Sequence, residues 1–316
     1  MKINFISYLD PFTHSGGGEQ ITKKLILSGR RRGHSINQTH NNPHSVDYDS
    51  TADLNILWDI FNCPEQQNPF NLNDLQYYMT NKKYVYGTGG YEDICHLGTV
   101  PCEGITDGVS CLVSESHETF GPGGIGRPKP SYCSVKRRDI LLKNADLCIF
   151  FSEAHKNLTK KLIGDVNHFI AIPPCEDLSV FYNQHRERDI EILSYGGHLE
   201  YKGFFNIMKK FPTSCPVFLG GGSDTLIRLY NYGKYIGKIP YDQMPAILNR
   251  TKKFVHMPRW VEPFGLTTLQ ALLCGCDVVE NENSTVTKGI IVEEYVKEIK
   301  RWSNCEPIWS KIESLK

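Results

Sequence analysis

One local pattern recurs along the whole chain: a short apolar run, a glycine-rich turn, and then a segment with the apolar spacing of a helix. In the first half INFISYL is followed by GGGEQITKKLILSGRRRG, and in the second half DIEILSY is followed by GGHLEYKGFFNIMKKF. Apolar runs that alternate with helical segments are typical of α/β domains with parallel strands. The pattern therefore predicts parallel α/β sheets in both halves.

The length of the chain predicts two domains. It has 316 residues, of which 40% are hydrophobic, and a domain usually holds roughly 100–200 residues. The Pro-Pro break in FIAIPPCEDLSVF marks the boundary. We therefore expect an N-terminal domain over residues 1–171 and a C-terminal domain over residues 172–316. The end of the chain is expected to be helical, with an apolar stripe of Val292, Tyr295, Val296 and Ile299.

Composition argues against two classes of protein. The formal net charge is zero, so no overall field attracts DNA or a membrane. No apolar run approaches the roughly 20 residues that span a bilayer, and MKINFISYLD lacks the pattern of a signal peptide. The eleven cysteines are scattered, which favours free thiols in a reducing compartment. We therefore expect a cytoplasmic protein without a transmembrane segment.

Four turns that follow apolar runs are rich in glycine or combine proline with glycine: Gly16–Gly18, Gly196–Gly197, Gly220–Gly222 and Pro263–Gly265. In open α/β sheets, ligands bind beyond the carboxyl ends of the strands, where helix N-termini favour phosphate. A tight turn alone explains any single glycine. Four such turns, in both halves, indicate a ligand with a diphosphate group in a cleft between the domains.

Three polar residues follow these turns. Lys202 lies near the start of a helix, where it could reach a phosphate, although a solvated lysine is the plainer interpretation. Glu262 precedes Pro-Phe-Gly at a strand end and could accept hydrogen bonds from sugar hydroxyls, or simply complement a helix dipole. Gln270 follows eight residues later, so we expect it to share a helical face with Glu262.

Six segments, taken in order, resemble one family. They are ADLCIFFSEAHK, AIPPCEDLSVF, YGGHLEYKGF, PVFLGGGSD, YIGKIPYDQMPAIL and EPFGLTTLQALLCGCDVV, and they span residues 145–280. Together they resemble the group 1 family of retaining GT-B glycosyltransferases, which includes sucrose synthase-like and lipopolysaccharide sugar transferases. The resemblance implies an α/β fold of two Rossmann-like domains whose parallel sheets face a central cleft. It also implies that the last helix crosses back to the N-terminal domain.

The resemblance further implies a donor site for a nucleotide diphosphate sugar, with no cofactor and no metal ion. Glu262 matches the first family glutamate, which contacts the donor sugar, and Gln270 replaces a second glutamate that usually holds the ribose hydroxyls. Lys202 matches the phosphate lysine, whereas His198 stands where the partner arginine falls, unless a deletion displaces that arginine. The residues expected to bind the donor are Gly17, Gly18, Gly197, His198, Lys202, Gly221, Ile239, Pro263, Phe264, Gly265, Leu266 and Gln270.

Catalysis in this family is thought to rest on positioning and on stabilisation of the leaving diphosphate. Besides Glu262, we expect a carboxylate of the first domain to orient the acceptor hydroxyl. Glu92 and Asp93 are the candidates, with His96 behind them, because GTGGYEDICH follows a strand. An exposed turn acid explains these residues equally well.

Two further patterns suggest metal sites but are better explained as loops. Asp47 and Asp49 have the spacing of metal-dependent sugar transferases, yet they lie in a polar stretch. The residues between 95 and 135 hold cysteines and histidines without the close Cys-x-x-Cys pairs of zinc sites. The residues considered for zinc are Cys95, His96, Cys102, Cys111, His117 and Cys133.

The acceptor is left open between a saccharide, a lipid, a protein and modified DNA. EYKGFFNIMKKF resembles phage DNA-base glucosyltransferases, and RPKPSYCSVKRR, at residues 127–138, is basic and could follow a phosphate backbone. That hypothesis implies a viral enzyme in a host cytoplasm, although acids and bases are nearly balanced over the first 160 residues.

Two other hypotheses concern the class of protein. Gln270 and the missing arginine leave room for a degenerate protein that binds a nucleotide sugar without turning it over. A Rossmann oxidoreductase is disfavoured, because THSGGGEQ does not match G-x-G-x-x-G. Neither the sugar, whether hexose or pentose, nor an oligomeric state follows from the sequence.

Overall fold

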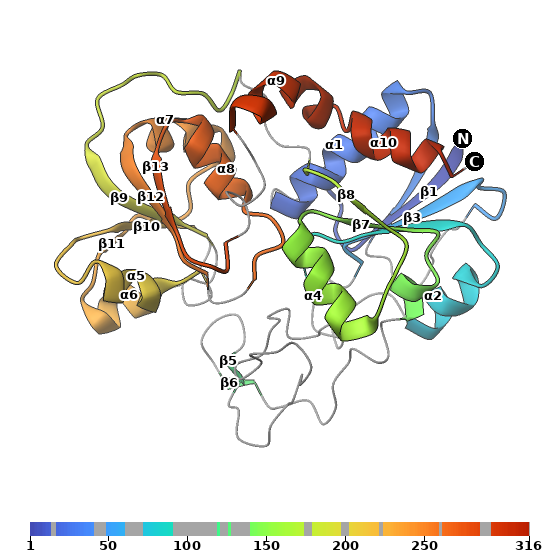
Figure 1. The fold of residues 1–316 in the computed structure, drawn as a ribbon, viewed down its shortest axis with the longest axis horizontal. Helices are drawn as coiled ribbons and strands as arrows, with labels where there is room; N and C mark the ends of the chain where they lie inside the picture. Colours follow the sequence, from blue (N-terminus) through green and yellow to red (C-terminus); the bar gives the residue numbers. More distant parts are fainter. Residues whose placement is uncertain are drawn as a thin grey trace. The chain divides into compact units, whose positions relative to one another are not determined.

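The computed structural model describes two compact units, which are treated separately below (Figure 1). The described residues are 1–13, 17–40, 49–60, 72–90, 119–120, 126–127, 140–173, 179–196, 202–220, 224–258, 261–284 and 292–315. The first unit comprises Met1–His117, Lys129–Cys175 and Lys300–Lys316, and the second comprises Glu118–Pro128 and Glu176–Ile299. The chain thus returns to the first unit at its end.

Within its described residues, the first unit has a six-stranded parallel sheet in the order β2-β1-β3-β4-β7-β8. The strands are β1 (Lys2–Ser7), β2 (Ser35–His40), β3 (Leu54–Trp58), β4 (Tyr84–Gly87), β7 (Leu147–Phe150) and β8 (His168–Ile170). Strands β3, β4 and β7 are buried at every residue. Continuous burial explains why these runs are largely apolar, with the buried Asn55 as an exception, since a parallel sheet is covered on both faces.

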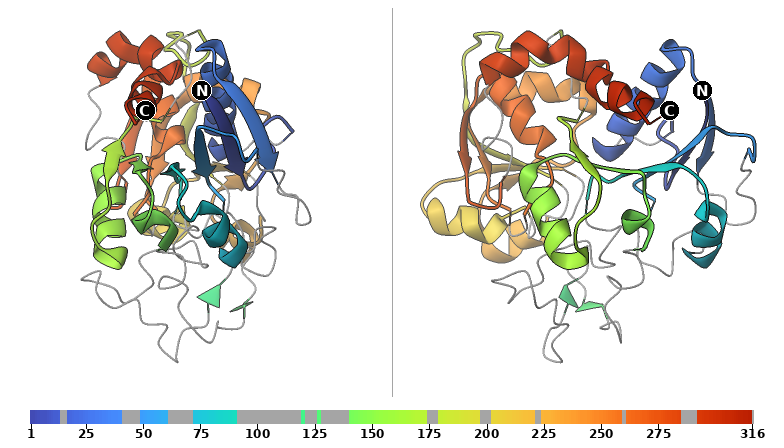
Figure 2. Two further views of the ribbon diagram at one scale, coloured as in Figure 1. Left: turned by 90° about the vertical axis from the view of Figure 1, so that its right-hand side faces the viewer. Right: turned by 45° about the vertical axis from the view of Figure 1, so that its right-hand side comes forward.

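Helices cover both faces of the first sheet. They are α1 (Gly17–Arg31), α2 (Leu72–Met79), α4 (Glu153–Ile163) and α10 (Glu306–Glu313). Helices α1 and α10 lie on one face, and α2 and α4 lie on the other (Figures 1 and 2). Local signals set the ends of α4: the Ser152 side chain accepts a hydrogen bond from the His155 N–H at 3.1 Å, and Gly164 ends the helix.

The C-terminal helix α10 packs against α1. The Trp309 indole is fully buried and donates a hydrogen bond to the Leu25 carbonyl at 3.1 Å. Glu313 binds Arg32 at 2.7 Å and His34 at 2.9 Å. Hydrogen bonding to Arg32, opposed by burial and aided by His34, lowers the pKa of Glu313 to about 2. The chain end is therefore part of the first unit's core.

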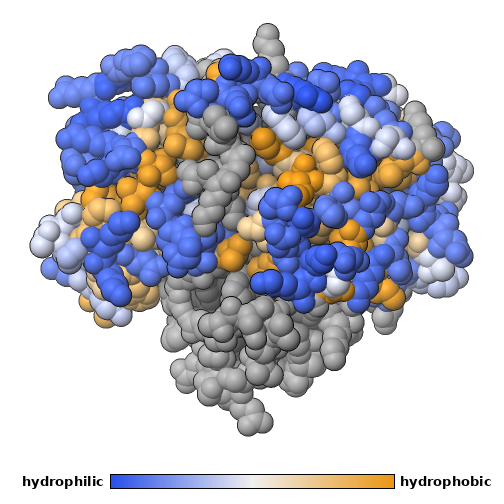
Figure 3. Space-filling view, in the orientation of Figure 1, coloured by the Kyte–Doolittle hydropathy of each residue, from blue (hydrophilic) through white to orange (hydrophobic). Residues whose placement is uncertain are grey.

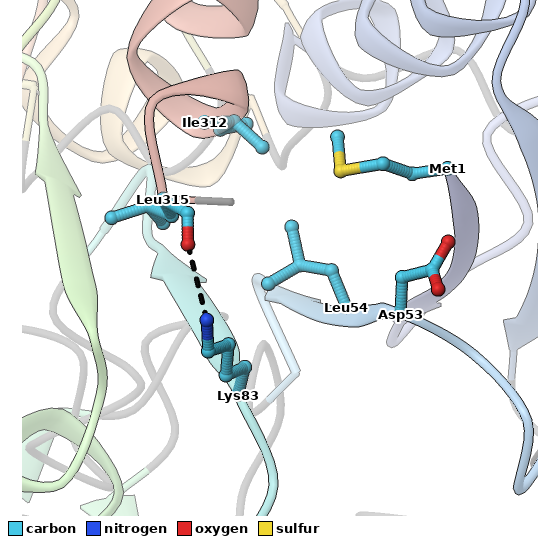
Figure 4. Close-up of a pocket in the computed structure, with 6 residues that line it drawn as sticks. All are labelled: Met1, Asp53, Leu54, Lys83, Ile312 and Leu315. Carbon is cyan, nitrogen blue, oxygen red and sulfur yellow. Dashed lines mark hydrogen bonds between the residues drawn. The ribbon is translucent and has the colours of Figure 1, made fainter.

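A hollow of about 500 Å³ lies where this helix meets the sheet (Figure 4). It is lined by Met1, Asp53, Leu54, Lys83, Ile312 and Leu315. The Lys83 ammonium donates to the Leu315 carbonyl across it at 3.3 Å. Met1, Asp53 and Lys83 precede strands β1, β3 and β4, so the hollow is at the amino ends of the strands, opposite the edge where α/β sheets bind ligands.

The second unit has a five-stranded parallel sheet in the order β11-β10-β9-β12-β13, counted over its described residues. The strands are β9 (Ile190–Tyr195), β10 (Val217–Leu219), β11 (Lys234–Tyr235), β12 (Thr251–His256) and β13 (Asp277–Glu280). The helices are α5 (Phe204–Lys210), α6 (Thr225–Tyr230), the 3-10 helix η2 (Tyr241–Gln243), α7 (Met244–Asn249) and α8 (Leu266–Leu273). A short antiparallel pair, β5 (Thr119–Phe120) with β6 (Gly126–Arg127), also belongs to this unit.

Helices α5 and α6 lie on one face of the second sheet, and α7 and α8 lie on the other (Figure 1). An aromatic core joins the first pair to the strands: Phe204 of α5 lies 5.4 Å from Phe218 and 5.9 Å from Tyr232, measured between ring centroids. Ile192, Ile207, Ile227 and Val255 also belong to this buried cluster. The core anchors the start of α5 directly behind the carboxyl ends of β9 and β12.

Helix α9 (Val292–Ser303) connects the second unit to the last residues of the first. Among the described residues, none of the helices is long and apolar enough to cross a membrane. Hydrophilic residues cover most of the described surface on the face shown in Figure 3, with hydrophobic residues between them.

Candidate functional site

The candidate site lies at the carboxyl ends of β9 and β12 in the second unit. From β9 the chain continues through α5 to β10 on one side, whereas β12 lies on the other side of β9 and continues through α8 to β13. The direction of strand order therefore reverses between these two strands. In open α/β sheets this reversal opens the crevice in which ligands bind.

Two glycines allow the backbone to pack tightly at this edge. Gly203, which precedes α5, has φ 97°, and a Cβ there would lie 1.9 Å from the Met257 carbonyl oxygen beyond β12. A Cβ on Gly220 would lie 2.4 Å from the Gly196 carbonyl oxygen. Only a residue without a side chain permits both approaches. The turns after β9, β10 and β12 consequently converge on one small area.

Three ionisable side chains meet there. One oxygen of the Glu262 carboxylate binds the Lys202 ammonium, and the other binds Nε2 of His256. The side chains of His256 and Glu262 are 0% and 6% exposed, whereas that of Lys202 is 23% exposed. Burial alone would raise the pKa of Glu262, but the charges and hydrogen bonds of His256 and Lys202 lower it to about 2. Glu262 is therefore a buried, ionised carboxylate.

The turn that carries Glu262 is fixed by the loop after β13. The side chains of Asn281 and Asn283 donate to the Pro258 carbonyl at 2.9 and 3.1 Å. The Glu262 N–H in turn donates to the Asn283 carbonyl at 3.0 Å. These bonds hold Glu262 outside the helix that follows, with its side chain turned toward β12.

The fold of the chain is similar to that of solved glycosyltransferases. Sucrose-phosphate synthase from Thermosynechococcus elongatus matches with a TM-score of 0.62 and 15% identity, over 98% of this chain and 90% of that one. Anabaena HepE in complex with UDP-glucose matches with a TM-score of 0.59 and 15% identity, over 98% of this chain and 95% of that one. The lipopolysaccharide outer core galactosyltransferase WaaB matches with a TM-score of 0.51 and 11% identity, over 97% and 91%.

The chain has the GT-B fold. The expectation of an α/β protein with two parallel sheets is confirmed. The sequence matches no protein-family model and no curated protein. The likeness to the solved structures is thus one of fold at low identity, and the chemistry must be argued from the side chains of this chain.

Of the sequence-predicted residues in the second unit of this GT-B chain, Lys202 and Glu262 lie in direct contact. Gln270 does not share a helical face with Glu262, and that expectation is wrong. Helix α8 begins at Leu266, four residues after Glu262, because Gly265 precedes it in a non-helical conformation. Gln270 is buried, and its amide donates to the Tyr241 hydroxyl at 3.2 Å.

The other described candidates of this unit lie near the same edge. Pro263 and Gly265 are buried, and Phe264 is half-buried. The Leu266 N–H donates to the Phe264 carbonyl at 3.2 Å, so it is engaged within the turn. Ile239 is half-buried and follows Gly237, whose carbonyl accepts the Gly220 N–H at 3.0 Å.

In the first unit, Gly17 and Gly18, which the sequence places in a turn before the helix, are the first two residues of α1. The structure places Asp59 beside them: a Cβ on Gly18 would lie 3.4 Å from its carboxylate. Asp59 follows β3, has φ 47°, and accepts a hydrogen bond from the Gly89 N–H at 2.5 Å. Sequence reasoning missed this carboxylate, although its place directly after an apolar strand is the signal that pointed to Glu92 and Asp93.

Several predicted residues lie outside the described part of the chain. They are Glu92, Asp93, His96, Gly197, His198 and Gly221, together with Gly16, Asp47, the candidate zinc ligands and the basic stretch apart from the β6 residue Arg127. Within the described residues, no group of three His, Cys, Asp or Glu side chains is arranged to hold a metal ion.

His256 and Tyr241 are the residues of the second unit that sequence reasoning missed. His256 is a polar residue within the apolar strand segment FVHM. A single polar residue in an apolar run was the only sign in the sequence that this side chain could belong to a site. Tyr241 lies in the turn before α7, and nothing local in the sequence connects it with Gln270.

Proposed function

We propose that this protein is a glycosyltransferase that moves a sugar from a nucleotide diphosphate sugar to an acceptor hydroxyl, with retention of configuration at the anomeric carbon. The observation that carries the proposal is the cluster of Lys202, Glu262 and His256 at the point of the second sheet where strand order reverses. The GT-B fold supports it, because Anabaena HepE, which shares the fold, was solved with UDP-glucose.

In this proposal, Lys202 pairs with the diphosphate of the donor. Its ammonium is the most exposed group of the cluster, and a cation placed there stabilises the negative charge that grows on the leaving diphosphate. Glu262 accepts hydrogen bonds from hydroxyl groups of the donor sugar, which an ionised carboxylate does well. Gln270, held by Tyr241, contacts the ribose hydroxyls as a neutral amide.

The proposed reaction needs neither a cofactor nor a covalent intermediate on the protein. The acceptor hydroxyl attacks on the same face from which the diphosphate departs, and the protein contributes orientation and charge. We propose that no metal ion takes part, with Lys202 supplying the positive charge beside the phosphates.

The acceptor is assigned to the first unit, where Glu92 and Asp93 are proposed to orient its hydroxyl. A saccharide, lipid or protein acceptor fits this scheme. Modified DNA has no specific support among the described residues, since the basic stretch after Arg127 lies outside them. The buried, ionised Glu262 favours an enzyme over a degenerate binding protein.

A panel of UDP-, GDP- and ADP-sugars tests the proposal by thermal shift. A donor that binds only the folded protein raises the melting temperature by mass action. We expect one nucleotide class to stabilise the protein, followed by slow donor hydrolysis or transfer. If none of the three classes changes the melting temperature, the proposal is wrong.

Lys202→Ala tests the assignment of the phosphate site. We expect it to weaken the binding of the nucleotide sugar and of the product nucleoside diphosphate together, by roughly tenfold or more, because a charge-assisted contact is lost. Lys209→Ala, an exposed position in α5, the helix that follows Lys202, is the control and should change neither affinity. Diphosphate affinity that survives Lys202→Ala would remove Lys202 from the site.

A further inference from the structure

The outer side of helix α1 is basic. The buried residues of this helix, which include Ile21, Leu25 and Ile26, lie on one side of it. After the first turn, the positions outside this side fall within one arc of about 120°, because an α-helix has about 3.6 residues per turn. No residue of that arc is acidic. The residues of the arc are Gln20, Lys23, Lys24, Leu27, Arg30 and Arg31, which are half-buried or exposed.

An aromatic side chain lies among these cations. Phe12, in the segment between β1 and α1, is 39% exposed, and Leu27 on the helix is 36% exposed. The Lys23 ammonium lies over the Phe12 ring at 5.7 Å from its centroid, and Cζ of Arg30 lies at 5.8 Å. Each cation thus contacts a ring rather than a carboxylate of the described residues. We call Phe12, Lys23, Leu27 and Arg30 the basic patch of α1.

Acidic side chains of the neighbouring elements are engaged elsewhere. On α10, Glu313 and Glu306 are each paired with an arginine, at 2.7 and 3.8 Å. Before α1, Asp10 accepts a hydrogen bond from the Phe12 N–H at 2.9 Å. Glu19 lies in the first turn of α1, where it complements the positive end of the helix dipole. The patch therefore has a local excess of positive charge, although the formal net charge of the chain is zero.

We propose that the basic patch of α1 docks the first unit onto the surface of a bilayer that contains anionic lipids. Lys23 and Arg30 face the lipid phosphates, and each basic side chain close to an anionic surface adds to the attraction. Phe12 and Leu27 enter the headgroup layer, as the apolar side chains of interfacial basic helices do. These two side chains favour a bilayer over a nucleic acid, because a phosphate backbone attracts cations but offers no apolar layer.

This inference does not depend on the proposed function. The patch belongs to the first unit and contains none of the residues proposed to bind the donor or to orient the acceptor. Docking and donor binding can therefore be measured separately, and the failure of one leaves the other in place.

Sedimentation with vesicles tests the proposal. Vesicles of phosphatidylcholine alone are compared with vesicles in which about a third of the lipid is phosphatidylglycerol. We expect the protein to pellet with the anionic vesicles only. Raising the salt concentration from about 0.1 M to about 1 M shortens the Debye length from about 10 Å to about 3 Å, so binding should fall steeply. Pelleting with neither kind of vesicle, or with both equally, would overturn the proposal.

The double variant Lys23→Gln with Arg30→Gln locates the binding. It removes two positive charges from the patch and should lower the vesicle partition coefficient about tenfold or more. The matched control is Lys209→Gln with Lys210→Gln, an exposed basic pair at the end of α5 that removes the same charge from the chain. Circular dichroism and the melting temperature check the fold of both variants. If the control variant loses as much binding, net charge rather than the patch is responsible and the proposal is wrong.

Phe12→Ser tests the apolar part of the patch. It should weaken vesicle binding several-fold and leave the slope of the salt dependence unchanged, because burial of apolar surface is not screened by salt. Duplex DNA serves as a competing polyanion and should not displace the protein from anionic vesicles. Unchanged binding in Phe12→Ser, or a preference for DNA over vesicles, would show that the partner is not a bilayer.

Discussion

At the scale of single residues, Glu262 is the central acidic group of the candidate site in the second unit. It is buried, ionised, and held between a fully buried histidine and a partly exposed lysine. Glu262→Gln keeps the shape but removes the charge proposed to contact the donor sugar, so we expect transfer to fall by roughly 10²–10³-fold. Transfer of labelled sugar measures this, with the fold checked by circular dichroism.

The control for this prediction is Glu282→Gln. Glu282 is an exposed acid in the loop after β13, close in sequence to the asparagines that support the Glu262 turn. It should leave transfer unchanged. A Glu262→Gln enzyme with normal turnover would show that the carboxylate has no role in the reaction.

The depressed pKa of Glu262 predicts how stability depends on pH. Its ordinary value is 4.5 and its folded value is about 2, so its stabilising effect is present above about pH 4.5 and is lost as the pH falls toward 2. The effect is on the order of 3 kcal/mol at neutral pH, since one pKa unit corresponds to about 1.4 kcal/mol. Denaturant unfolding from pH 7 to pH 2 tests this.

Glu313 is the companion in that experiment, because its pKa is also lowered to about 2, chiefly by Arg32. The unsubstituted protein should lose stability in the same window through both groups. The free energy of unfolding should therefore fall less between pH 4.5 and pH 2 in Glu262→Gln, and also in Glu313→Gln, than in the unsubstituted protein. If Glu262→Gln loses as much stability over this pH range as the unsubstituted protein, the pKa of Glu262 is not depressed.

The sequence predicted Lys202 and Glu262 as neighbours of one ligand, but it could not predict their partner. His256 meets Glu262 only because β12 ends where the Pro258 turn folds back onto the loop after β13. That geometry depends on Asn281 and Asn283, which follow in sequence but carry no motif. Contacts of this kind arise from tertiary packing and leave little local signal.

At the scale of elements, the junction between β12 and α5 supports the site. Gly203 has φ 97°, and an added Cβ would lie 1.9 Å from a backbone oxygen of Met257. Gly237 has a similar φ of 83° but open space around it. A comparison of alanine substitutions at the two glycines therefore separates the free-energy cost of backbone strain from that of steric overlap at the site.

We expect Gly237→Ala to cost about 1–2 kcal/mol, the price of a left-handed conformation for alanine. Gly203→Ala should cost about 2 kcal/mol more, because strand and helix must move apart. It should also weaken UDP-glucose binding, since Lys202 is its neighbour in the chain. Urea midpoints and calorimetric affinities measure both effects, and equal costs for the two variants would contradict the steric argument.

Elements with strong apolar patterns were predicted well. Strands β1 and β9, helix α1, and the ends of β4 and β12 lie where the sequence indicated. Strand β2, with the sequence SINQTH, was missed because it is an edge strand whose polar residues show no apolar run. The start of α8 was placed too early, because Pro263 and Gly265 form a turn that the apolar spacing of the following residues does not reveal.

At the scale of the whole molecule, the first unit is completed by residues from the far end of the chain. Trp309 of α10 is fully buried, with its ring 5.0 Å from His34, and it packs so closely on α1 that a Cβ on Gly29 would lie 2.3 Å from the indole. The sequence indicated helices at the chain end, but the contact between Trp309 and Leu25 joins residues 284 positions apart. No local pattern reports such a pairing.

Trp309→Ala tests how much the packing of α10 against α1 contributes to the stability of the first unit. Removing a fully buried tryptophan leaves a large cavity and removes the hydrogen bond to Leu25, so we expect a loss of about 3–5 kcal/mol and a fall in melting temperature of roughly 10 °C. Trp302→Ala is the matched control: this indole is only half-buried in α9, and its loss should cost about 1 kcal/mol. Because Lys202, Glu262 and Gln270, the proposed donor contacts, belong to the second unit, UDP-glucose affinity at temperatures well below the transition should be retained in both variants. Equal destabilisation by the two substitutions would show that α10 is not the closing element of the first unit's core.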